Sequence, residues 1–98
     1  DNNITIDGST DLSFTENVQK RYEAYGWHVQ QVTDVVNQLD DLRAAIDAAK
    51  AETGKPSLIA IKTVIGQGSS KAGSHAVHGA PLGAQDLAGA KKSWGLPP

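Results

Sequence analysis

The chain has 98 residues, which allows one domain at most, and folding of such a domain buries roughly two-thirds of the surface of the unfolded chain. Its formal net charge is −2 and its basic residues form no cluster, which argues against a nucleic-acid or anionic membrane surface. The absence of cysteine excludes disulfides, thiolate metal sites and thiol nucleophiles, and no apolar run approaches the roughly 20 residues that span a bilayer.

The amino-terminal residues predict a short strand and a turn. Ile4-Thr5-Ile6 has the β-branched character of a strand, and Asp7-Gly8 is a turn pair. The sequence starts at Asp1 without an initiator methionine. We therefore expect these residues to be part of a larger protein.

A helix and a second strand are predicted next. Ser13 and Glu16 have the spacing of a capping box, in which the serine hydroxyl accepts a backbone N–H and the glutamate side chain reaches back. Apolar and aromatic residues then recur at helical spacing as far as Gly26, which can adopt the left-handed conformation that ends a helix. The alternation from Trp27 to Val32 predicts a strand.

The second half of the chain predicts two more helices and one more strand. Apolar residues at helical spacing indicate a helix that opens at Asp40 or Asp41 and stops at Gly54. The residues from Ser57 to Ile65 are largely β-branched or apolar and predict a buried strand. A short helix is predicted from Ala84 to Trp94.

This alternation of strands and helices predicts an α/β fold in which a parallel sheet carries helices on its faces. Ligands of such sheets bind outside the carboxyl ends of the strands. We therefore expect the segment after the first strand and the loop after the last strand to border one pocket.

The loop from Ile65 to Gly83 is the strongest candidate for a binding site. It reads IGQGSSKAGSHAVHGAPLG, and its glycines let backbone N–H groups approach a phosphate while an imidazole binds the same anion. We favour His78, in His-Gly-Ala-Pro, over His75, although an isolated loop histidine is more often simply exposed. His28 alternates within a strand, which indicates a structural or solvent-facing role.

Asn2 and Asn3 precede the first strand, and a turn is the commoner explanation for such residues. The alternative is a metal site, because an amide oxygen is a ligand suited to Mg²⁺ or Ca²⁺ and a nearby backbone carbonyl adds a second oxygen. Generic nucleotide-binding fingerprints, catalytic triads and zinc motifs are absent.

Six segments, taken together and in order, resemble one known family, the transketolases. The resemblance covers nearly the whole chain, and several separate matches in order are more specific than any single one. The matching segments are DNNITIDG at 1–8, KRYEAYGW at 20–27, KPSLI at 55–59, IGQGS at 65–69, AGSH at 72–75 and VHGAPL at 77–82.

The resemblance implies the carboxyl-terminal part of a thiamine-diphosphate-binding domain, with residues 1–98 forming a portion of that domain in a larger transketolase chain. It implies that the Asn2 side chain contacts the cofactor and the divalent ion, Mg²⁺ or Ca²⁺, and that Ile4 offers its backbone carbonyl to the same ion. Ile6 and Ile65 would lie against the cofactor. His78 would contact the cofactor diphosphate and the substrate, and is the implied catalytic residue.

The implied activity is transfer of a two-carbon ketol unit from a ketose phosphate to an aldose phosphate, in the pentose phosphate pathway or the Calvin cycle. The resemblance also implies a homodimer in the cytoplasm, or in the plastid stroma of a photosynthetic eukaryote. Other site residues would come from the remainder of the chain and from the neighbouring subunit, so we expect residues 1–98 alone to be inactive. Dihydroxyacetone synthase and a non-catalytic structural or interaction piece are the alternatives.

Overall fold

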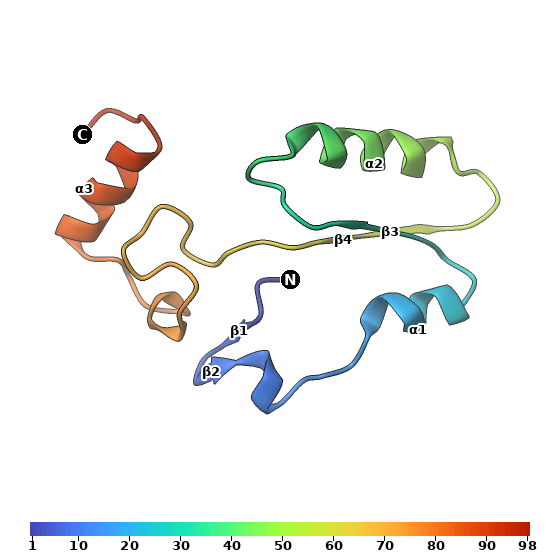
Figure 1. The fold of residues 1–98 in the computed structure, drawn as a ribbon, viewed down its shortest axis with the longest axis horizontal. Helices are drawn as coiled ribbons and strands as arrows, with labels where there is room; N and C mark the ends of the chain where they lie inside the picture. The colour runs from blue at the N-terminus through green and yellow to red at the C-terminus, as the bar shows by residue number, and fades with distance from the viewer. The chain divides into compact units, whose positions relative to one another are not determined.

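The computed structural model describes residues 1–98, which group into two units (Figure 1). The first unit contains Asp1 and residues 16–63, and the second contains residues 2–15 and 64–98. No helix in either unit is long and apolar enough to cross a membrane.

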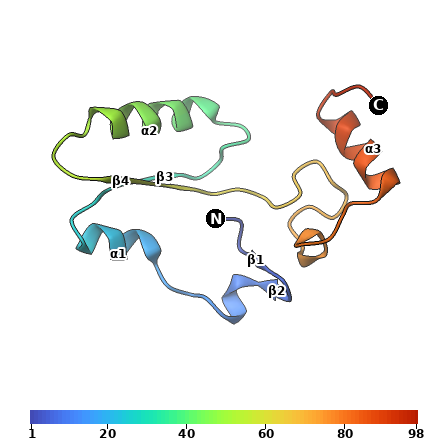
Figure 2. The same ribbon diagram turned by 180° about the vertical axis from the view of Figure 1, so that it is seen from behind.

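Two parallel strands form the centre of the first unit. β3 (His28–Val32) pairs with β4 (Ser57–Ile61), with His28 opposite Ser57 and Val32 opposite Ile61. Helices α1 (Val18–Ala24) and α2 (Leu39–Ala51) lie on opposite sides of this pair (Figures 1 and 2). This arrangement confirms the prediction of a parallel sheet with helices on its faces, although the sheet is small.

Few side chains of this unit are fully buried. Val32 is 2% exposed and Ala45 of α2 is 6% exposed, and the Gln30 amide donates to the Ala45 carbonyl at 2.9 Å. Every residue of β4 is only half-buried. The prediction of a buried strand as far as Ile65 was wrong, because β3 ends at Val32, opposite Ile61, and the bond from the Lys62 N–H to the Val32 carbonyl is the last one between the two strands.

Aromatic residues join α1 to the start of β3. The Tyr22 ring lies edge-on to Tyr25 and Trp27, with centroids 5.7 and 4.9 Å apart, a preferred geometry for aromatic pairs. Gly26 between them has φ of +86°, which a residue with a Cβ adopts only at a cost. The prediction that Gly26 ends this helix is therefore confirmed.

The start of α1 differs from the prediction. Asn17 caps the helix, with its side-chain oxygen accepting the Lys20 N–H at 3.0 Å. Ser13 lies outside the helix, and Glu16 forms an ion pair with Arg21. The predicted capping box was wrong because asparagine caps a helix as well as serine does, and Asn17 stands closer to the residues that become helical.

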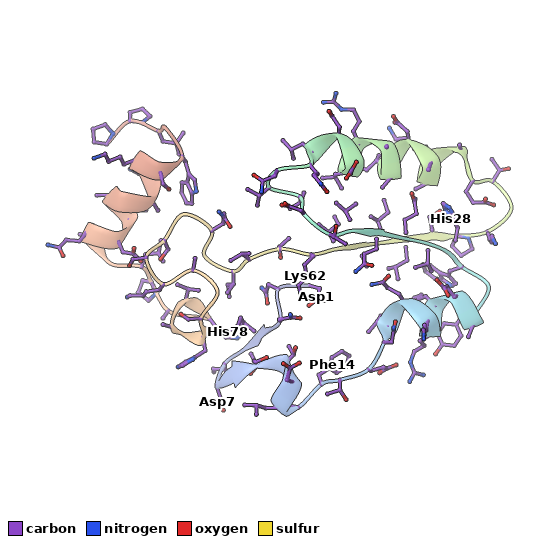
Figure 3. All side chains as sticks on the ribbon, viewed as in Figure 1. Asp1, Asp7, Phe14, His28, Lys62 and His78 are labelled. Atoms are coloured by element: carbon purple, nitrogen blue, oxygen red, sulfur yellow. The ribbon has the colours of Figure 1, made fainter.

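The first strand does not join the parallel sheet. β1 (Ile4–Thr5) pairs antiparallel with β2 (Gly8–Ser9), so Ile6 and Asp7 form the turn of a hairpin (Figure 3). The Thr5 hydroxyl donates to the Gly8 carbonyl across this turn at 3.0 Å. The prediction of a third parallel strand was wrong because two turn residues close a local hairpin before a longer connection is possible.

Asp1 is attached to β4 of the first unit. Its amino group donates to the Ile61 carbonyl at 2.9 Å, and the Thr63 N–H donates to the Asp1 carbonyl at 2.8 Å. This is the pattern of a parallel strand pair, in which one residue bonds to the two neighbours of its partner. The Lys62 ammonium lies 3.8 Å from the Asp1 carboxylate (Figure 3).

The second unit contains the hairpin, the glycine-rich loop and α3 (Ala84–Ser93). A 3₁₀ turn at Thr10–Leu12 follows the hairpin, and a second one at His75–Val77 lies within the loop. Ala90 of α3 is fully buried. The predicted helix from Ala84 is confirmed, with Trp94 as its C-cap.

The cap of α1 can be tested by substitution. Asn17→Ala removes the acceptor of the Lys20 N–H, and we expect the free energy of unfolding to fall by about 1 kcal/mol. Ser13→Ala should change it by less than about 0.5 kcal/mol, as expected for a surface position outside such features. Urea denaturation of both variants measures this difference. A larger loss in Ser13→Ala than in Asn17→Ala would contradict the observed cap.

Candidate functional site

The hairpin places two oxygen atoms on the same side of β1. The Ile4 N–H donates to the Asn2 Oδ1 at 3.1 Å, and the Thr10 N–H donates to the Asn3 carbonyl at 2.8 Å. In the observed register, Ile4 and Ser9 are a non-hydrogen-bonded pair, so the N–H and C=O of Ile4 point away from β2. The Asn2 side-chain oxygen and the Ile4 carbonyl are therefore available on that side.

Asn3 links these two residues in an unusual backbone conformation. Its φ is +63°, and it is the only residue other than glycine with a positive φ. Asparagine tolerates this left-handed region better than most residues, although the conformation still costs energy. The two hypotheses for Asn2 and Asn3, a turn and a metal site, are thus compatible. The turn brings the Asn2 side-chain oxygen and the Ile4 carbonyl to one side of β1.

The first part of the glycine-rich loop closes on itself. The Gly73 N–H donates to the Ile65 carbonyl at 2.9 Å, and the Ser69 N–H donates to the Gly66 carbonyl at 2.8 Å. Gly66 lies against Val77, since a Cβ at position 66 would stand 3.0 Å from a Val77 methyl group. These contacts bring the start of the loop next to the 3₁₀ turn that precedes His78.

The loop is also fixed to the carboxyl end of α3. The Ser93 hydroxyl contacts the Gly68 carbonyl at 3.3 Å. A Cβ at position 68 would lie 2.7 Å from Cε2 of Trp94, closer still to Nε1 of the same ring, and 2.8 Å from the Ser93 hydroxyl, and φ of Gly68 is +93°. Glycine is required here both for the space and for the backbone conformation.

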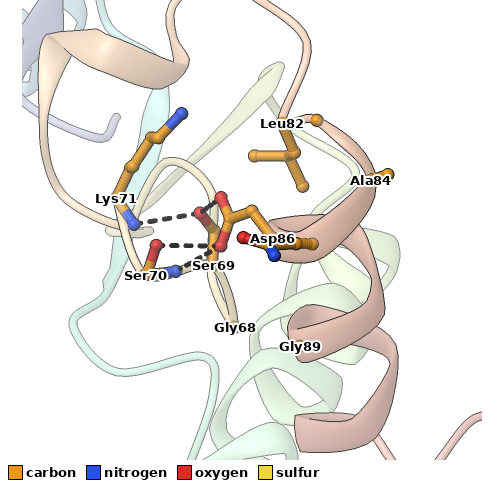
Figure 4. Close-up of a pocket in the computed structure, with 10 residues that line it drawn as sticks. Gly68, Ser69, Ser70, Lys71, Leu82, Ala84, Asp86 and Gly89 are labelled. Carbon is orange, nitrogen blue, oxygen red and sulfur yellow. Dashed lines mark hydrogen bonds between the residues drawn. The ribbon is translucent and has the colours of Figure 1, made fainter.

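A carboxylate fixes the same loop to the first turn of α3 (Figure 4). The Ser69 hydroxyl donates to the Asp86 Oδ2 at 2.5 Å, and both the N–H and the hydroxyl of Ser70 donate to the Oδ1 at 2.9 Å. The Ser69 hydrogen bond, then that of the Ser70 N–H, and more weakly the charge of Lys71 hold the pKa of Asp86 below its usual range. Asp86 is therefore ionised at neutral pH, and its contribution to stability is fully present above the ordinary pKa of an aspartate and is lost as the pH falls from there through the lowered pKa.

A pocket of about 820 Å³ lies beside this carboxylate (Figure 4). It is formed by the loop residues that bond to Asp86 and by the start of α3. None of the residues predicted for the site lines it. The lining residues are Gly68, Ser69, Ser70, Lys71, Leu82, Gly83, Ala84, Gln85, Asp86 and Gly89.

All five predicted site residues belong to the second unit. Asn2 and Ile4 are half-buried and joined by a hydrogen bond, and Ile6 in the hairpin turn is 67% exposed. Ile65 is half-buried at the start of the loop, and His78 is exposed near its end. The structure thus places these residues on two segments of one unit, the hairpin and the loop.

The other histidines occupy different settings. His75 is exposed at the start of its 3₁₀ turn. The His28 Nδ1 lies 3.0 Å from the hydroxyl of Ser57, its cross-strand neighbour, in agreement with the structural role predicted for His28. No group of three or more His, Asp or Glu side chains is arranged to hold a metal ion.

Sequence reasoning missed the group formed by Ser69, Ser70 and Asp86. The only sequence signal was an acidic residue in the first turn of a helix, a position that favours negative charge next to the helix dipole. The partners lie 16 and 17 residues earlier, within a loop whose path was unknown.

Residues 1–98 match the family described as "Transketolase, thiamine diphosphate binding domain" over their full length. The chain belongs to the transketolase family. It is 55% identical over 96 residues to Transketolase 1 of Candida albicans, a match that covers 98% of this chain and 14% of that protein. It is 49% identical over 98 residues to the chloroplastic Transketolase-1 of Arabidopsis thaliana, covering 99% of this chain and 13% of the relative.

The structure is likewise similar to solved transketolases. The transketolase of Pichia stipitis in complex with sedoheptulose 7-phosphate superimposes with a TM-score of 0.91 and 50% sequence identity. That match covers 98% of this chain and 14% of the solved chain. The chain therefore spans about one-seventh of the length of the transketolases it matches, within their thiamine diphosphate binding domain.

The close approach at Gly68 leads to a stability prediction. Gly68→Ala should lower the free energy of unfolding by about 2–4 kcal/mol, because the added methyl group meets Trp94 and Ser93 and φ is positive. Gly95→Ala is the matched control, since φ there is +71° but no atom lies within 4 Å of the added carbon. It should cost about 1 kcal/mol. Urea denaturation followed by tryptophan fluorescence compares them, and equal losses would contradict the packing described for Gly68.

Proposed function

We propose that residues 1–98 form the part of a transketolase that binds the diphosphate of thiamine diphosphate together with a divalent cation. The match to the family's thiamine diphosphate binding domain supports this function. The observation in the structure that carries it is the pair of oxygens, Asn2 Oδ1 and the Ile4 carbonyl, on one side of β1.

The donor chemistry of this pair fits Mg²⁺ or Ca²⁺. Both ions prefer oxygen ligands, and an amide oxygen and a backbone carbonyl are suitable neutral donors. The Asn2 Oδ1 already accepts the Ile4 N–H, and its second lone pair remains for a cation. Asn2 would bind the ion and border the cofactor, with Ile4 as the second ligand.

The loop would supply the groups on the anionic side. His78 is exposed and lies between the 3₁₀ turn and Gly79, so its imidazole can donate a hydrogen bond to a phosphate oxygen. We assign it contact with the cofactor diphosphate and the substrate. Ile6 and Ile65 would provide apolar contacts, and the high exposure of Ile6 fits a side chain that a ligand covers.

The proposed reaction is transfer of a two-carbon ketol unit between sugar phosphates. Thiamine diphosphate, when bound, supplies the electron sink that this carbon–carbon chemistry requires. The residues of this chain bind and orient the diphosphate end, and His78 holds a polar hydrogen near the substrate. We propose sugar phosphates as substrates, and the Pichia stipitis complex with sedoheptulose 7-phosphate supports this choice. We also propose that the longer transketolase chain forms a homodimer, as the family resemblance implies.

The location proposed is the cytoplasm, or the plastid stroma in a photosynthetic eukaryote. The chloroplastic name of the Arabidopsis relative supports the second setting. In both settings, the activity requires a transketolase chain longer than these residues.

A chimera tests the function and the role of His78. Residues 1–98 replace the matching segment of the Candida albicans transketolase, and the product is assayed with xylulose 5-phosphate, ribose 5-phosphate, thiamine diphosphate and Mg²⁺. We expect sedoheptulose phosphate to form, and His78→Ala to lower kcat/KM by about 100-fold, since a positioned proton donor typically contributes this much. His75→Ala is the control and should retain the rate within about threefold. A folded chimera without ketol transfer would contradict the proposed function.

The proposed cation site makes a separate prediction. Asn2→Ala in the same chimera should raise the Mg²⁺ concentration for half-maximal cofactor binding by about 10-fold, because one ligand of the ion is lost. Asn37→Ala, the same change at an exposed position of the other unit, should leave it unchanged. Calorimetric titration of thiamine diphosphate at a series of Mg²⁺ concentrations measures both. An Asn2 variant with unaltered Mg²⁺ dependence would overturn the assignment of this ligand.

A further inference from the structure

Asp86 is the residue through which α3 holds the glycine-rich loop. One carboxylate receives three hydrogen bonds from two consecutive serines, at 2.5, 2.9 and 2.9 Å. Ser69 is 9% exposed, and its hydroxyl oxygen also accepts the Lys71 N–H at 3.0 Å. Bonds to a charged acceptor are stronger than those between neutral groups, so this contact fixes the middle of an otherwise glycine-rich segment.

Hydrogen bonds connect this contact to the start of the loop. The Ser69 N–H donates to the Gly66 carbonyl, and the Ala72 N–H donates to the Ser69 carbonyl at 3.2 Å. The Gly73 N–H then closes the turn on the Ile65 carbonyl at 2.9 Å. The position of Ile65 therefore depends on a turn whose central serines are held by Asp86.

Packing connects the same turn to His78. Gly66 lies against the Val77 side chain, closely enough that an added Cβ would stand 3.0 Å from it. Val77 is the last residue of the 3₁₀ turn, and the His78 N–H donates to the His75 carbonyl at 3.0 Å. A shift of the turn at Gly66 would therefore move the backbone that carries His78.

We propose that Asp86 is a positioning residue for the cofactor: from α3 it holds the loop in the shape that presents Ile65 and His78 to the diphosphate. This inference rests on the proposed function. Asp86 itself lies in the wall of a different pocket and its carboxylate is bonded to Ser69 and Ser70, so it acts on Ile65 and His78 through these two serines. Groups that bind a ligand work best when a second set of contacts holds them rigidly in place.

The first arm of the test measures cofactor affinity in the chimera with the Candida albicans transketolase. Asp86→Asn keeps the size of the side chain but removes its charge and one acceptor oxygen. We expect it to raise the Kd of thiamine diphosphate about 10-fold, the lower end of the loss that follows when residues supporting a metal site are removed. Asp86→Glu keeps the charge and should recover part of the affinity. Asp47→Asn, the same change at an exposed position of α2, should leave the Kd unchanged.

The second arm measures amide hydrogen exchange in the same variants without cofactor. In Asp86→Asn we expect faster exchange at Ser70 and also at Gly73 and His78, whose N–H groups bond to Ile65 and His75. A residue with a merely local structural role would affect Ser70 and Lys71 only. Ser70→Ala, which keeps the backbone bond to Asp86, is a milder second variant in case Asp86→Asn fails to fold, and should show the same pattern at smaller amplitude.

The outcomes separate this inference from the proposed function. A parent chimera that does not bind thiamine diphosphate would contradict the proposed function. With a parent that binds it, an unchanged Kd in Asp86→Asn and Ser70→Ala, or faster exchange confined to Ser70 and Lys71, would overturn the positioning role. A raised Kd together with faster exchange at Gly73 and His78 would support it.

Discussion

The second unit depends on the contact between the Asp86 carboxylate and the two serines of the glycine-rich loop. A segment rich in glycine loses much conformational entropy when it takes one shape, and this loop has no strand pairing to offset that loss. Two contacts with α3 offset this entropy loss instead. They are the charged hydrogen bonds at its amino end and the packing of Gly68 against Trp94 at its other end. The helix thus acts as a support along which the loop is attached at two places.

The first unit is stabilised in a different way, by backbone pairing between β3 and β4 and by helices on both sides of that pair. Its fully buried apolar side chains are few, and polar side chains add specific bonds, such as that from Gln30 to the backbone of α2. Asp34 does the same in the connection to α2, where it accepts the N–H and the side-chain amide of Asn37, and these bonds lower its pKa. Strand pairing, helix packing and hydrogen bonds in short polar turns therefore together stabilise this unit.

The features predicted correctly from the sequence are those that neighbouring residues determine. Helical periodicity located α2 and α3, Gly26 marked the end of α1, and the alternation of elements indicated parallel pairing. Predictions that required a choice between nearby residues or partners were wrong. Asn17 caps α1 in place of Ser13, and β1 pairs with β2 in a hairpin and not with the parallel sheet. Asn2 and His78 were candidates from their local sequence and received their roles from the resemblance to a family, whereas the role of Asp86 depends on partners that only the folded loop brings to it.

The two backbone bonds of Asp1 have a consequence for the edge of β4. Because they follow the pattern of parallel pairing, a residue that precedes Asp1 in a longer chain would lie beside Ile61 along that edge. Further residues joined there in the same register would add a third parallel strand next to β4. An unpaired strand edge is a template for pairing with other chains, so such a strand would also protect the sheet from association.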